Sequence, residues 1–97
     1  MPDDVVVTGI GVYSPIGCGD AAFWRALYDG TSSAGPIDNL DVSELSRKIA
    51  CRVKTDLPPN PGMGRASRLA VAAAADAIAS ARFTSEELSG LRVSTIV

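Results

Sequence analysis

The sequence predicts an α/β fold in which helices cover a mixed sheet. We expect this fold to be incomplete in the chain alone. Three stretches carry the prediction: the valine run Val5–Val7, an alanine-rich helical pattern near residues 65–81, and an apolar extended stretch at 91–97. A run of β-branched residues without polar interruption is typical of a strand covered on both faces, as in the middle of a parallel sheet. Such a strand needs neighbours that 97 residues supply only in part.

The first strand is expected over about Val5 to Thr8, followed by a turn rich in glycine and proline. Pro15 excludes a helix running directly out of this strand. Asp20 is a suitable N-cap for a helix over Ala21–Tyr28, and Gly30 a suitable C′ residue. The aromatic and leucine side chains of this helix share one face, which predicts a packing helix.

The middle of the chain predicts an irregular segment and one half-exposed strand. Residues 37–45 carry no clear period, apart from a short helical turn starting at Ser43. The period-two alternation of Lys48–Lys54 predicts a strand with Cys51 on its apolar side, as a small core residue. The outer side of this strand is basic.

The last third predicts a loop, a long helix, a short helical turn and a strand. Leu57–Gly62 is a loop by composition, and Arg65–Ala81 is a helix by alanine content and period, expected to be largely buried. One stripe of this helix holds Leu69, Ala73 and Ala77, and another holds Ala66, Ala70, Ala74 and Ile78. A helical start at Thr84 is broken by Gly90, and Leu91–Val97 is the final strand. Because the chain ends inside an apolar strand, we expect residues 1–97 to be one part of a larger domain.

Composition excludes several classes of function. The net charge of −2 gives no overall attraction to nucleic acid or to an anionic membrane. No apolar run is long enough to span a bilayer, and the acidic start lacks the features of a secretory signal, so we expect a cytoplasmic protein.

The chemistry of the chain is limited by its lack of histidine. Without histidine no Ser-His or Cys-His mechanism can be built within the chain. Cys18 and Cys51 lie in no metal-ligand spacing, and although a disulfide between them is one option, reduced thiols are expected in the cytosol. We therefore predict no metal site.

Two further features invite functional hypotheses. Gly9-Ile10-Gly11 after a strand suggests a dinucleotide fingerprint, but Ser14 stands where the third glycine belongs and Pro15 replaces the helix start. Six of the nine basic residues form a second candidate, a docking surface for an acidic partner, and the alternative is a solvated face. These six are Arg47, Lys48, Arg52, Lys54, Arg65 and Arg68.

The ordered set of motifs resembles the opening of the β-ketoacyl synthases, the condensing enzymes of fatty-acid and polyketide synthesis. The likeness covers essentially the whole chain and lies in Val5–Gly17, Phe23–Ser33, Gly35–Ile37, Asp41–Ser43, Ile49–Val53, Arg65–Ala70 and Arg92–Val93. It implies the N-terminal part of a thiolase-like αβαβα fold. It also implies that the catalytic cysteine and two histidines lie beyond this chain, so no catalytic, cofactor-binding or metal residue is assigned to it.

The same resemblance implies the partners. The substrates of such enzymes are carried on the phosphopantetheine arm of an acyl carrier protein, and no other cofactor is expected. The rest of the ketosynthase is expected either as a continuation or as a second polypeptide, within a homo- or heterodimer.

Two departures from the family pattern keep alternatives open. The Pro-rich loop Leu57–Gly62 replaces a basic helical segment that helps many relatives dock the carrier protein, and Gly64-Arg65 stands where relatives often have Asp-Arg. An alternative is therefore a structural subunit like a chain-length factor, which pairs with a catalytic ketosynthase. A free-standing binding module is a third hypothesis.

Overall fold

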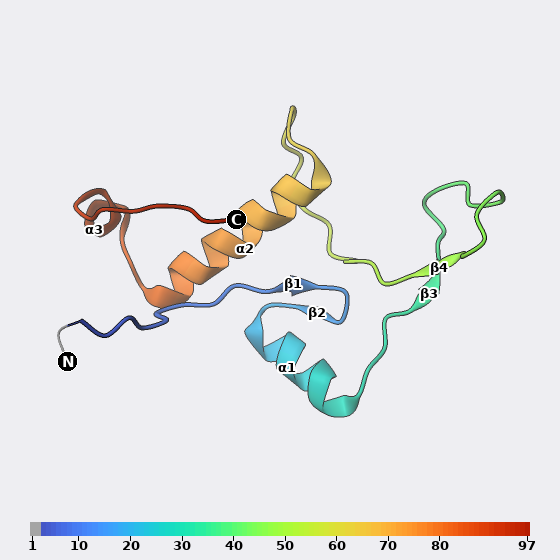
Figure 1. The fold of residues 1–97 in the computed structure, drawn as a ribbon, viewed down its shortest axis with the longest axis horizontal. Coiled ribbons are helices and arrows are strands. Elements are labelled where there is room, and N and C mark those ends of the chain that lie inside the picture. The colour runs from blue at the N-terminus through green and yellow to red at the C-terminus, as the bar shows by residue number, and fades with distance from the viewer. Residues whose placement is uncertain (1–2) are drawn as a thin grey trace.

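The computed structural model describes residues 3–97, and its regular structure lies mainly in helices (Figure 1). In chain order the elements are β1 (Tyr13–Ser14), β2 (Gly17–Cys18), α1 (Asp20–Asp29), β3 (Gly35–Pro36), β4 (Ile49–Ala50), α2 (Arg65–Ala81) and α3 (Ser85–Ser89). The strands form two separate antiparallel pairs, β1 with β2 and β3 with β4.

The three helices agree well with the sequence. The boundaries of α2 match the predicted ones, and Gly30 ends α1 in the left-handed conformation, with φ 67°. The prediction for the start of α1 was wrong by one residue, because Gly19 is the N-cap and Asp20 is already helical. Thr84 caps α3 by accepting a hydrogen bond from the backbone N–H of Glu87 at 3.1 Å, and Gly90 closes that helix.

The predicted strands are largely absent from the described residues. Residues 5–8 and 91–97 hold no strand, and the predicted strand 48–54 shrinks to Ile49–Ala50. The physical reason is that a strand exists only where a neighbour accepts its backbone hydrogen bonds, and neither terminal segment has one here. The strand predicted at Val5–Thr8 is therefore not formed in the described chain, and its sheets are two antiparallel pairs.

Two burial predictions were also wrong. Cys51 is exposed, because the thin β3–β4 pair has no layer packed on its apolar side. α2 contains no fully buried residue, because the rest of the chain covers it only in part. Among the described residues, Ala26 is the single buried hydrophobic side chain.

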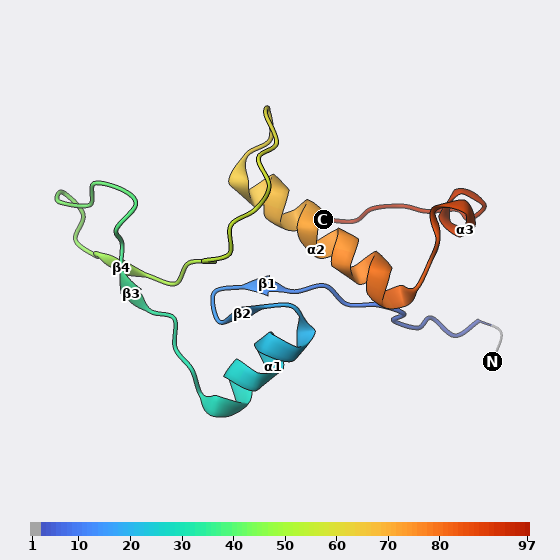
Figure 2. The ribbon, with the colours of Figure 1, turned by 180° about the vertical axis from the view of Figure 1, so that it is seen from behind.

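The molecule is extended and exposes more surface than a compact domain of its size. Its radius of gyration is 17.2 Å, whereas a compact domain of this length has about 12.5 Å. Its accessible surface is 8182 Å², about 3,000 Å² more than the roughly 5,200 Å² expected for a compact monomer of this mass. The β3–β4 pair stands apart from the helices, as Figure 2 shows from behind.

The exposed surface is rich in apolar side chains. Val5 and Val7 expose 98% and 82% of their surface, and Ile96 exposes 94%. Trp24, on α1, is half exposed and packs edge-on against Phe23 with ring centroids 5.7 Å apart. These side chains lie on elements from both ends of the chain, so the uncovered surface is not confined to one segment.

Candidate functional site

The segment 9–13, which leads into β1, lies against α2 through glycines (Figure 1). A Cβ added at Gly11 would collide with the carbonyl oxygen of Ala73 and lie 2.8 Å from its carbonyl carbon. A Cβ at Gly9 would collide with the carbonyl oxygen of Ala77. The two glycines therefore let two backbones approach, and the space that a dinucleotide would need beside them is filled by α2.

The turn after this segment is a two-residue hairpin loop. Ser14 donates its hydroxyl hydrogen to the carbonyl oxygen of Gly17 at 2.7 Å, and the N–H of Gly19 donates to the carbonyl of Val12 at 2.9 Å. No helix opens at Pro15, as predicted, so the turn lacks the helix N-terminus on which a dinucleotide pyrophosphate rests. This geometry supports packing as the role of the glycine turn.

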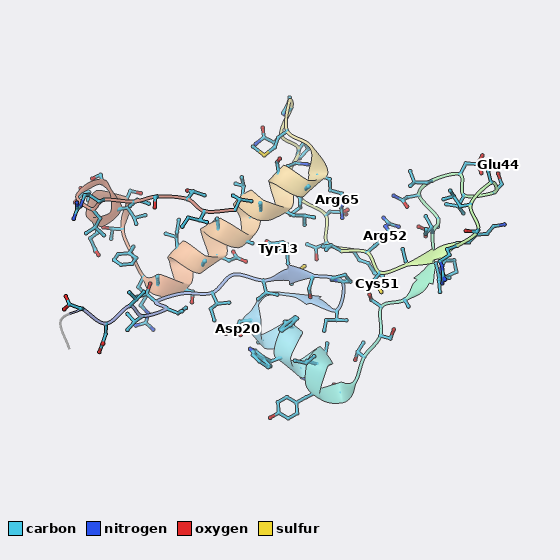
Figure 3. The ribbon with its side chains drawn as sticks, viewed as in Figure 1. Tyr13, Asp20, Glu44, Cys51, Arg52 and Arg65 are labelled. Carbon is cyan, nitrogen blue, oxygen red and sulfur yellow. The ribbon has the colours of Figure 1, made fainter. Side chains whose placement is uncertain are left out.

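The two cysteines are free thiols in different surroundings. Cys18 is half-buried in β2, and its sulfur accepts a hydrogen bond from the Thr55 hydroxyl at 3.0 Å. Cys51 is exposed beside β4, where Figure 3 labels it next to Arg52. Neither thiol can be activated by a histidine of this chain, because the chain holds none.

Two of the six basic residues proposed as a docking surface, Arg52 and Arg65, have partners within the chain. Arg65 opens α2 and donates to the carbonyl oxygen of Val53 at 2.6 Å. Arg52 lies near β4 and pairs with the Asp38 carboxylate at 2.6 Å. Figure 3 places the labelled Arg52 and Arg65 on separate segments.

Two hollows lie beside these basic residues. The first, of about 220 Å³, is mostly apolar and lies between the Pro-rich loop and α2, with Arg68 on its wall. The second, also of about 220 Å³, lies on the β3–β4 pair and is lined by polar and small residues. Sequence analysis missed Ser33 and Asp38 of the second hollow, because Gly35-Pro36 carries no strand signal that would have aligned them with Arg52.

The electrostatics of the described residues are mild. The Ser43 backbone N–H donates to the Asp41 carboxylate at 3.0 Å and lowers the pKa of that carboxyl below its ordinary value. No group of three or more potential metal ligands comes together within residues 3–97. Over the same stretch, none of the helices has the length and apolar character to cross a membrane.

Comparison with known proteins defines the family. Residues 2–97 match the family model described as the N-terminal domain of β-ketoacyl synthase. The chain therefore belongs to the β-ketoacyl synthase family.

Individual relatives agree with this assignment. The "Actinorhodin polyketide putative beta-ketoacyl synthase 2" of Streptomyces coelicolor is 34% identical over 91 residues, which cover 87% of this chain and 22% of that protein. The 3-oxoacyl-(acyl-carrier-protein) synthase 2 of Rhizobium meliloti is 43% identical over 49 residues, 50% of this chain and 12% of that protein. The predicted family resemblance is confirmed.

A solved structure contains a segment that is similar to this chain in sequence and fold. The structure titled "The ishigamide ketosynthase/chain length factor" superimposes with a TM-score of 0.75 and 36% identity, over 84% of this chain and 22% of that one. The chain thus spans about a fifth of the length of these longer relatives. Its arrangement of helices and short strands is that of part of an α/β ketosynthase.

Proposed function

We propose that this chain is the N-terminal part of a β-ketoacyl synthase and has no catalytic residue of its own. The completed enzyme would catalyse decarboxylative Claisen condensation of acyl and malonyl units held on an acyl carrier protein. The observation that carries the proposal is the family match over residues 2–97, together with relatives in fatty-acid and polyketide synthesis.

The chemistry of the proposed reaction requires residues that this chain lacks. A cysteine thiolate accepts the acyl group from the carrier thioester and releases the carrier thiol. The malonyl unit then loses CO₂, and its carbanion attacks the acyl-cysteine and frees the thiolate, while two histidines stabilise the developing charge. The chain holds no histidine, so these groups would come from the rest of the enzyme.

The exposed surface supports the need for completion. The chain exposes about 3,000 Å² more surface than a compact domain of its size, and the valines at residues 5–7 are exposed to solvent. Both features are expected of a segment that packs into a larger core. In the proposed architecture, a thiolase-like αβαβα fold, residues 5–8 and 91–97 become strands when neighbouring strands accept their hydrogen bonds. The completed molecule would be a ketosynthase-type dimer in the cytoplasm.

The completion experiment tests this proposal. The chain is expressed alone and with the polypeptide that continues it, and folding is followed by circular dichroism and size exclusion. We expect a stable, cooperatively melting species, and CO₂ release from malonyl carrier protein, only in the combined sample. A stable monomer formed by the chain alone would contradict the claim that it is incomplete.

A second candidate is a structural subunit resembling a chain-length factor. It is favoured by the solved neighbour, whose title names both a ketosynthase and a chain length factor. The sequence that completes the fold separates the two candidates. A reactive cysteine with two histidines there supports the enzyme, and their replacement supports the structural subunit.

A further inference from the structure

We propose that the hollow on the β3–β4 pair, here called the hairpin hollow, is a binding site for a small phosphate group. Its lining residues are Ser33, Gly35, Pro36, Asp38, Ala50, Arg52 and Lys54. The proposal is independent of the condensing activity, because none of these residues takes part in it.

The shape of the hairpin hollow follows from the strand register. Gly35 lies opposite Ala50 in the β3–β4 register, and these are the two smallest residues of the two strands. The surface over them is therefore recessed and forms the floor of the hollow. Ser33 precedes β3 by two residues and Arg52 follows β4 by two residues, and both line the hollow beside this floor. The floor is thus bordered by a hydroxyl and a guanidinium.

The charge of the hairpin hollow favours an anion. Arg52 and Lys54 contribute two positive charges, and Asp38 removes one, which leaves a net charge of about +1 at the lining. The Asp38 carboxylate accepts a hydrogen bond from one N–H group of Arg52 at 2.6 Å. A guanidinium has five N–H groups, so Arg52 keeps donors for a ligand while the ion pair orients it.

An unpartnered hydroxyl adds an independent observation. The Oγ atom of Ser33 is buried and has no hydrogen-bond partner within the described structure. A buried hydroxyl without a partner is unfavourable, and Ser33 is one of the residues that line the hairpin hollow, so a phosphate oxygen bound there would accept its hydrogen. Ser33 would then be the third donor beside Arg52 and Lys54.

Three donors around one floor favour phosphate over carboxylate. A tetrahedral phosphate offers an oxygen to each of the three donors at once, whereas a carboxylate has only two oxygens. Planar guanidinium groups also match the spacing of phosphate oxygens. The bound group would be free phosphate or the phosphate of a small ester.

Titration of the assembled protein, in which only this chain carries the ¹⁵N label, with inorganic phosphate tests the proposal, at constant ionic strength kept with sodium chloride. We expect saturable shifts of the Gly35 and Ala50 amide signals, with millimolar affinity. Acetate at the same ionic strength should bind more weakly. A parallel titration with glycerol phosphate distinguishes the sources, because tighter binding of the ester points to a small phosphorylated molecule, and equal binding points to free phosphate.

Matched variants make the test specific. Lys54→Gln should weaken phosphate binding by up to about fivefold, as expected when one exposed charge-assisted contact is lost. Arg92→Gln removes the same charge outside the hairpin hollow and should leave binding unchanged. Asp38→Asn should tighten binding, and Ser33→Ala should weaken phosphate binding but not acetate binding.

Several outcomes would overturn the proposal. Equal weakening by Lys54→Gln and Arg92→Gln would show a general charge effect. Tighter binding of acetate, or of a glutamate-rich peptide, would show that the hairpin hollow takes carboxylates. Absence of dispersed signals for Gly35 and Ala50 also contradicts it, because the floor requires the formed β3–β4 pair.

Discussion

The close contact between Gly11 and α2 makes a sharp prediction about stability. In Gly11→Ala, the new methyl group would lie 2.8 Å from the carbonyl carbon of Ala73 and 2.9 Å from the amide nitrogen of Ala77. Ordinary contacts begin at about 3.4 Å, so segment 9–13 must move away from α2 by more than about 0.6 Å, because the Ala73 carbonyl oxygen is nearer still.

The expected cost follows from this displacement. Overpacking in a tight contact destabilises a protein by about 1–3 kcal/mol. Such a loss lowers the ratio of folded to unfolded molecules by a factor of about 5 to 160. The midpoint of urea unfolding, followed by the circular dichroism of α2, measures this cost. It is measured on the assembled protein if the chain requires its completing polypeptide.

Two further variants make the Gly11 prediction refutable. Gly90→Ala is the matched control, since its added Cβ would meet the Glu87 carbonyl oxygen at an ordinary 3.6 Å. Ala73→Gly should not rescue Gly11→Ala, because the collision is with the backbone of residue 73 and not with its methyl group. A rescue by Ala73→Gly, or equal stability of the Gly11→Ala and Gly90→Ala proteins, would refute the proposed backbone contact.

Three other predictions concern single side chains. Thr84→Ala should destabilise α3 by about 1 kcal/mol through loss of its cap, measured as faster amide exchange in that helix, whereas a change at α1 would point to another cause. Cys51 should react with a thiol reagent faster than the half-buried Cys18, with two thiols counted in total, and equal rates would contradict the burial difference. Ser43→Pro removes the N–H that lowers the Asp41 pKa, so the pKa of Asp41 by NMR titration should rise toward its ordinary value. Because the folded pKa is lowered, the stabilisation from this contact exists above the ordinary pKa and is lost as the pH falls through the folded one.

Local signals explain what the sequence could predict. The boundaries of α2 come from helix propensity and from Gly64 and Arg82 at its ends, which act within a few residues. Likewise, Thr84 and Gly90 bound α3 through contacts three residues away. Elements that depend on neighbours along the chain were therefore predictable.

Strand formation depends on pairing partners, and the hydrophobic pattern of a sequence does not identify them. The apolar run at Val5–Val7 predicts burial on both faces, yet the described chain places nothing over it. The hairpin hollow shows the opposite case, since Gly35-Pro36 has no strand signal and becomes a strand because Ile49–Ala50 pairs with it. Long-range pairing decided both outcomes, and a single sequence carries little information about it.

The contact of Gly9 and Gly11 with α2 also has a consequence for biosynthesis. The two sides of this contact are separated by more than 60 positions along the chain. At typical elongation rates of about 5–20 residues per second, Gly9 waits roughly 3 to 14 seconds before Ala77 is synthesised. Closing a loop of that size costs about 3.7 kcal/mol of chain entropy. The segment around Gly9 and Gly11 thus lacks its helix partner for seconds during synthesis, long enough for a chaperone to bind it first.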